Sequence, residues 1–104
     1  MTLKFFNDNY DLNDYEIKSI KIEDNKLYLD INVVAYLELI ANGYRPEMMV
    51  DHEIIFIFNI EYKNTIFNEP YTVNKKYENN ILYLNINGNN FNIINDNVEV
   101  VQKL

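Results

Sequence analysis

Apolar and polar residues alternate along the stretch from Leu12 to Val33, with an interruption at EDN. In its second half, Leu27, Leu29, Ile31 and Val33 share one parity, and Tyr28, Asp30 and Asn32 share the other. Because successive side chains of a strand point to opposite faces, this period of two predicts a strand with one buried face. The first half, Tyr15 to Ile22, changes phase after Ile17, which predicts a strand with a β-bulge near Lys18 or Ser19. With Asp24 and Asn25 at the turn, the two halves predict a hairpin.

Shorter apolar runs predict the other strands. The run from His52 to Tyr62 is apolar on both faces, which is typical of a central strand covered on both sides. Asn87 and Gly88 favour a tight hairpin turn. The remaining predicted strands are Tyr71 to Tyr77, Ile81 to Ile86, Phe91 to Ile94 and Val98 to Val101. Leu3 to Phe6 reads as a short apolar patch, followed by a polar, turn-rich connection up to Asp14.

Residues 34–42 predict one short helix. Ala35, Leu37 and Glu38 are good helix formers, and Gly43 is placed like a residue that ends a helix. No convincing N-cap residue precedes the segment, and a continued strand is the alternative.

The elements together predict a mainly β fold, at the margin of α+β. We expect an antiparallel sandwich or curved meander of about six or seven short strands. No long helices alternate with the strands, so a parallel doubly wound sheet is not expected. With 104 residues, the chain is long enough for one hydrophobic core, and we expect a single domain over residues 1–104.

The charge balance narrows the classes of partner. The chain has 16 acidic residues against 9 lysines and arginines, a net charge of -7. Nucleic-acid binding is disfavoured because it depends on cationic side chains that displace counterions. An acidic chain would meet a basic protein rapidly, although the same charge also simply keeps a small protein soluble. No secretory signal and no apolar stretch of membrane-spanning length is visible, so we expect a cytoplasmic protein with no membrane contact.

Candidate chemistry is sparse. His52 is the sole histidine and Ser19 the sole serine, and no cysteine is present, so no catalytic triad or histidine pair for a metal is visible. The segment Asn9 to Asp14 offers oxygen ligands, but Asp14 stands where a calcium-binding EF-hand loop has glycine, and Ile20 where it has glutamate. We therefore expect no catalytic residue, no metal and no cofactor, and the chain is not expected to be an enzyme.

What remains is a surface on the first hairpin. Tyr28, Asp30 and Asn32 lie on its polar face, and Asp14 and Glu16 enter from the preceding strand. Tyrosine is enriched at protein interfaces, and acidic residues beside it would attract a basic partner. These five residues form the predicted partner-binding surface. The alternative is an ordinary exposed sheet face whose polar residues are solvated and bind no partner.

The segment LNDYEIKSIKIEDNKLYLDI resembles the opening hairpin of small, mostly β bacterial domains. These include immunity proteins of polymorphic toxin systems and related uncharacterised families. The residues that carry the resemblance are Leu12, Asp14, Ile17, Ile20, Ile22, Leu27, Leu29 and Ile31. Such families commonly have His then Asp before the first strand, whereas this chain has Asn13 and Asp14, so any role of that histidine does not carry over.

The resemblance implies a protein that neutralises a basic toxin by occluding it, here with the acidic, tyrosine-bearing face. Two alternatives remain. One is a structural or self-associating domain, a homodimer among its forms, that pairs through an exposed edge strand. The other is a small-ligand-binding β domain.

Overall fold

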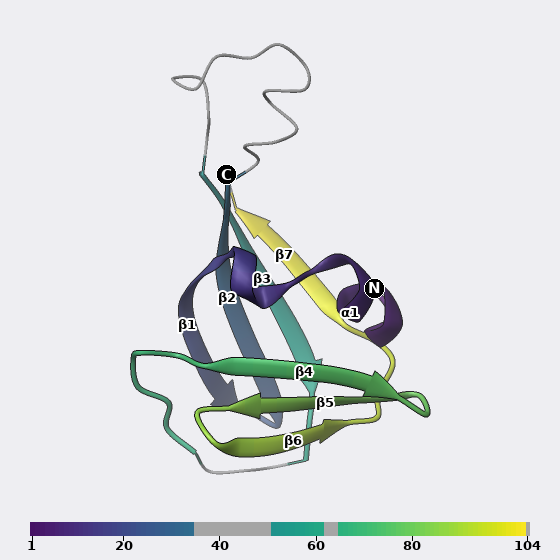
Figure 1. Cartoon of the computed structure of the whole chain (residues 1–104). Coiled ribbons are helices and arrows are strands. Elements are labelled where there is room, and N and C mark those ends of the chain that lie inside the picture. Colours follow the sequence, from purple (N-terminus) through teal and green to yellow (C-terminus); the bar gives the residue numbers. More distant parts are fainter. Residues whose placement is uncertain (35–50, 62–64, 104) are drawn as a thin grey trace.

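The computed structural model describes residues 1–34, 51–61 and 65–103 (Figure 1). The helical elements are α1 (Leu3–Asn9) and the short 3₁₀-helix η1 (Leu12–Asp14). The strands are β1 (Glu16–Glu23), β2 (Lys26–Val34), β3 (Asp51–Asn59), β4 (Val73–Glu78), β5 (Ile81–Ile86), β6 (Asn89–Ile93) and β7 (Glu99–Lys103). They form two antiparallel sheets with the strand orders β1-β2-β3-β7 and β4-β5-β6. In Figure 1 the second sheet lies across one face of the first, so the predicted mainly β, antiparallel architecture is confirmed.

Three tight turns close the hairpins within these sheets. Asp24 and Asn25 link β1 to β2, and Asn87 and Gly88 link β5 to β6, all with φ between 50° and 87°. Asn79 and Asn80 link β4 to β5 in the same way, with φ of 54° and 63°. Two consecutive residues with positive φ match the right-handed twist of the flanking strands. Asn, Asp and Gly tolerate this conformation, so the asparagine-rich composition has a structural role here.

A β-bulge sets the orientation of β1. The register of β1 against β2 shifts between Ile17 and Ser19, so that Ile17 lies opposite Ile31 and Ile20 lies opposite Leu29. Because the bulge inserts one extra residue, both isoleucines point to the buried face despite their spacing of three. The bulge predicted near Lys18 or Ser19 is confirmed.

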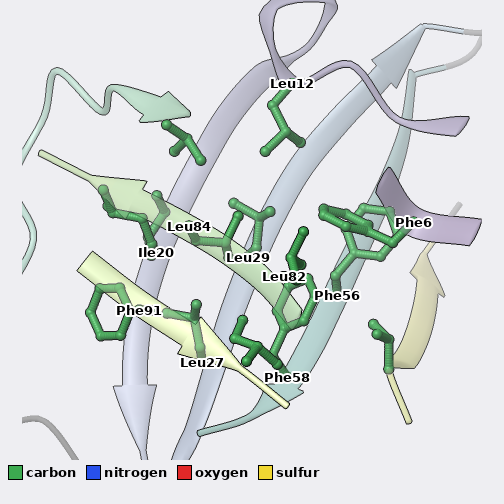
Figure 2. Packing of buried hydrophobic residues seen from close by; sticks show 14 of the residues in the cluster. Phe6, Leu12, Ile20, Leu27, Leu29, Phe56, Phe58, Leu82, Leu84 and Phe91 are labelled. Atoms are coloured by element: carbon green, nitrogen blue, oxygen red, sulfur yellow. The ribbon is translucent and has the colours of Figure 1, made fainter. Parts of the chain in front are cut away.

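The core lies between the two sheets. Figure 2 shows Leu27, Leu29 and Phe58 of the first sheet turned toward Leu82, Leu84 and Phe91 of the second. All six side chains are between 0% and 4% exposed. Burying each such side chain stabilises the fold by roughly 1.5 to 3 kcal/mol. The pleat therefore directs one face of every long strand into a shared apolar layer.

β3 occupies the predicted central position, between β2 and β7. Its inward residues Phe56 and Phe58 are fully buried. Ile57 points to the other side of the sheet, yet is only 9% exposed, since it lies between Tyr28 and Glu99 in the register. The strand ends at Asn59, three residues earlier than predicted, and Tyr62 lies outside the described residues.

The interpretation of the first residues as an apolar patch and a polar connection was wrong, because Leu3–Asn9 forms α1. The hydroxyl of Thr2 caps the helix by accepting a hydrogen bond from the Phe5 N–H at 3.0 Å. Phe6 is fully buried, with its ring centroid 4.9 Å from that of Phe56. A helix this short is marginal in isolation, so its stability comes from packing that has no local sequence signal.

The helix predicted over residues 34–42 falls almost wholly on residues 35–50, which lie outside the described part of the chain. At Val34 the backbone still belongs to β2.

Candidate functional site

Four of the five predicted partner-binding residues lie together on the outer face, by which we mean the face of the β1-β2-β3-β7 sheet that points away from the second sheet. Tyr28, Asp30 and Asn32 follow one another along β2, and Glu16 lies opposite Asn32. All three β2 side chains are half-buried, whereas Glu16 is exposed.

Asp14 does not enter from the strand, which corrects the predicted placement. It belongs to η1, which precedes β1. The side chain of Asp11 caps η1 by accepting a hydrogen bond from the Asn13 N–H at 3.1 Å. This local cap turns the chain before the strand begins.

Lysines balance the charge of the outer face. Lys18 Nζ lies 3.4 Å from Glu53 Oε2, an ion pair that reaches from β1 over β2 to β3. Lys26 Nζ lies 3.7 Å from Glu99 Oε1, from β2 over β3 to β7. Exposed pairs of this kind contribute about 0 to 1 kcal/mol each to stability, but they cancel the local potential.

A lysine also contacts the ring of Tyr28. Lys21 Nζ lies 5.0 Å from the centroid of the Tyr28 ring, within range of a cation–π contact, and 3.4 Å from Glu23 Oε2. The outer face is therefore mixed in charge rather than acidic.

A second feature lies where the starts of β1 and β4 face each other. An open groove of about 780 Å³ is lined by Tyr15 and Glu16 on one side and by Glu69 and Tyr71 on the other. An adjoining hollow of about 400 Å³ shares Leu12, Asn13, Val73 and Asn74 with it and continues to Asp8 and Asp11 near the end of α1. We call the two together the β1–β4 groove.

Carboxylates dominate this groove. Asp8, Asp11, Glu16 and Glu69 line it, and none of them forms an ion pair with another described residue. Lys75 also lines it, and its Nζ donates a 2.6 Å hydrogen bond to the Asn7 carbonyl at the last turn of α1. The described lining therefore carries four carboxylates against one ammonium and is negative on balance.

Tyr15 forms a rigid wall of the groove. Its ring centroid lies 6.3 Å from that of Tyr10, which packs in turn on Phe56 at 4.8 Å. Burial, and after it the charges of Tyr10, Asp14 and Asp11, raises the pKa of the Tyr15 phenol above its ordinary value. Tyr15 consequently remains a neutral hydroxyl near pH 7, with an aromatic surface beside carboxylates.

Of the groove residues, sequence reasoning found Glu16 but missed Asp8, Asp11, Tyr15, Glu69 and Tyr71, and the predicted Asp14 lies outside the lining. The acidic residues around η1 are visible as a local cluster in the sequence. The proximity of residues 69–74 to residues 12–17 cannot be recognised in the sequence, because it depends on how the two sheets pack.

Within residues 1–34, 51–61 and 65–103, no group of three or more His, Asp or Glu side chains is arranged to hold a metal ion. No helix in those same residues is long and apolar enough to cross a membrane.

No protein-family model, curated protein sequence or solved structure matches this chain. The resemblance of Leu12 to Ile31 to immunity-type hairpins therefore stays a prediction.

Proposed function

We propose that this chain is a non-enzymatic protein-binding domain that captures a basic partner protein in the β1–β4 groove. One observation carries the proposal: carboxylates that form no ion pair within the described part of the chain surround an open groove walled by Tyr15 and Tyr71, while the lysines of the first hairpin lie on the outer face.

The proposed mechanism has two stages. The negative field of the groove first accelerates encounter with a cationic surface. A lysine or arginine side chain of the partner then lies against the tyrosine rings, where a cation–π contact and a carboxylate neighbour both favour it. Because Tyr15 and Tyr71 already pack against the core, little side-chain entropy is lost when they bind.

This proposal keeps the kind of protein that the resemblance implies, a bacterial, cytoplasmic immunity-type protein that neutralises a toxin by covering it. It changes the surface. Of the five predicted residues, only Glu16 lines the groove and remains in the proposed site. Asp14 lines neither hollow, and Tyr28, Asp30 and Asn32 lie on the face that carries compensating lysines.

The test compares two triple variants that remove the same charge from different places. The first is Asp11→Asn, Glu16→Gln and Glu69→Gln in the groove, where Asn still caps η1. The second is Glu23→Gln, Glu78→Gln and Glu99→Gln, whose carboxylates each pair with a lysine outside the groove. An array of peptides that vary in basic charge is the probe, and affinity is measured by fluorescence anisotropy at low and high salt.

We expect the groove variant to bind basic peptides at least about tenfold more weakly, a loss of about 1.4 kcal/mol, and the control to bind as the unmodified chain does. Equal losses in both variants would show that only net charge matters and would contradict the proposal. The absence of any preference for basic over neutral peptides would contradict it as well.

A further inference from the structure

The edge strands of a β-sheet can pair with strands of other chains. The four edge strands of the two described sheets, β1, β7, β4 and β6, differ in how they are protected from such pairing. Edge strands are commonly blocked by charged side chains, bulges or polar residues. β1 has its bulge and Lys18 and Lys21, β4 has Lys75 and Lys76, and β6 is mostly asparagine. β7 instead presents two adjacent valines, Val100 and Val101, which are 36% and 42% exposed.

The backbone of β7 is ready to pair on its open side. Val98, just before the strand, donates from its N–H to the Met1 carbonyl at 2.8 Å and accepts from the Met1 ammonium at 3.1 Å. Backbone groups alternate in direction along a strand, so Val100 and Gln102 point the same way as Val98, away from β3. No strand in the described part of the chain pairs with this side of β7.

We propose that two copies of the chain pair through β7, antiparallel, about a two-fold axis at Val101. In this register Val100 lies opposite Gln102 of the second copy, and the two residues exchange both backbone hydrogen bonds. The same exchange occurs on the other side of the axis, so the interface is closed and self-complementary. The two Val101 residues then form a non-hydrogen-bonded pair, in which side chains approach most closely.

Strand length and existing contacts select this register. It pairs all five residues of β7, 99 to 103, with the second copy. A shift of two residues toward the start of β7 would place Gln102 opposite Val98, whose outward groups already bind Met1. A shift of two residues the other way would leave only residues 101–103 of β7 to pair with the second copy.

The dimer would join the two four-stranded sheets into one. Ile55 lies opposite Val101 in each copy, so the four side chains would form a continuous apolar stripe across the axis. β7 and β1 are opposite edges of the sheet, so both β1–β4 grooves would stay open. The inference is therefore independent of the function proposed above.

Cysteine cross-linking tests the register directly, because the chain has no cysteine of its own. Cα atoms of a non-hydrogen-bonded pair lie about 4.5 Å apart, within the range that a disulfide spans. Val101→Cys should form a disulfide-linked dimer readily under mild oxidation. Ile94→Cys, equally a cysteine at an exposed apolar position but outside β7, is the control and should cross-link at least tenfold more slowly.

Sedimentation velocity over a range of concentration gives the second measurement. The unmodified chain should approach twice 12.5 kDa as concentration rises, whereas Val101→Lys should remain a monomer and Ile94→Lys should behave as the unmodified chain. Circular dichroism verifies that each variant is folded. A monomer at all concentrations, or equal cross-linking at positions 94 and 101, would overturn the proposal.

Discussion

The outer face and the β1–β4 groove both contain acidic and tyrosine residues, but they differ in where their countercharges lie. On the outer face, Lys18 and Lys26 reach across a strand to glutamates that are far away in sequence. In the groove, the described lining holds one lysine for four carboxylates, and that lysine is bonded to a helix carbonyl. Similar side chains thus produce a surface of mixed charge in one place and a negative one in the other, because strand order decides which charges become neighbours.

α1, whose end lies beside the groove, is held to the core by Phe6, and Phe6 can be replaced without changing the outer face. Phe6→Ala should destabilise the protein by about 3 to 5 kcal/mol, since a fully buried phenylalanine is replaced and its site cannot fully collapse. Its neighbour Phe5 is 51% exposed, so Phe5→Ala should change stability by less than about 0.5 kcal/mol. Urea unfolding measures both. Similar losses in the two variants would mean that α1 is not held through Phe6.

The link between α1 and β4 can be broken next. Lys75→Met should cost about 1.5 to 3 kcal/mol, the usual value of a hydrogen bond from a charged donor, because the Asn7 carbonyl loses its partner. Lys76→Met is the control: within the described residues its ammonium pairs with Glu78 alone, at an exposed position, so its loss should be small. Thermal unfolding compares the two variants, and a larger effect at position 76 would contradict the assignment.

Removing two lysines would make the outer face more acidic and would test which surface binds basic peptides. Lys18→Gln combined with Lys26→Gln should reduce stability by no more than about 1 kcal/mol, since both ion pairs are at least partly exposed to solvent. Affinity for basic peptides should change by less than about twofold if the groove is the binding site. A clear gain in affinity would instead assign binding to the outer face, as the sequence alone predicted.

The smallest expected effect concerns Tyr15 and pH. The folded state raises the pKa of this phenol above its ordinary value of 10.0, so it holds the proton more tightly than the unfolded chain does. The resulting stability is fully present below pH 10 and is lost as the pH rises through the folded pKa. Tyr15→Phe should remove this part of the alkaline loss, which the urea midpoints at neutral and alkaline pH would report. An unchanged pH dependence would show that the Tyr15 phenol does not titrate differently in the folded state.

Local patterns predicted much of the fold. The phase change between Ile17 and Ile20 was sufficient to locate the bulge, and Asn87 with Gly88 was sufficient to locate a turn, since both depend on neighbouring residues only. α1 was missed because its seven residues form a helix only when Phe6 packs on β3. The groove was missed for a related reason, since Glu69 and Glu16 are 53 positions apart and line one hollow only after the sheets pack.

By itself the sequence determined which residues of each strand face the core, where the hairpins turn, and that the molecule carries excess negative charge. Pleat geometry and turn stereochemistry act over a few residues, so these properties can be recognised without knowing the fold. Only the tertiary structure decided where that charge is left uncompensated and which edge strand presents its valines to solvent. Coulombic and hydrogen-bonding partners are set by distance in space, and the order of strands in the two sheets determines that distance.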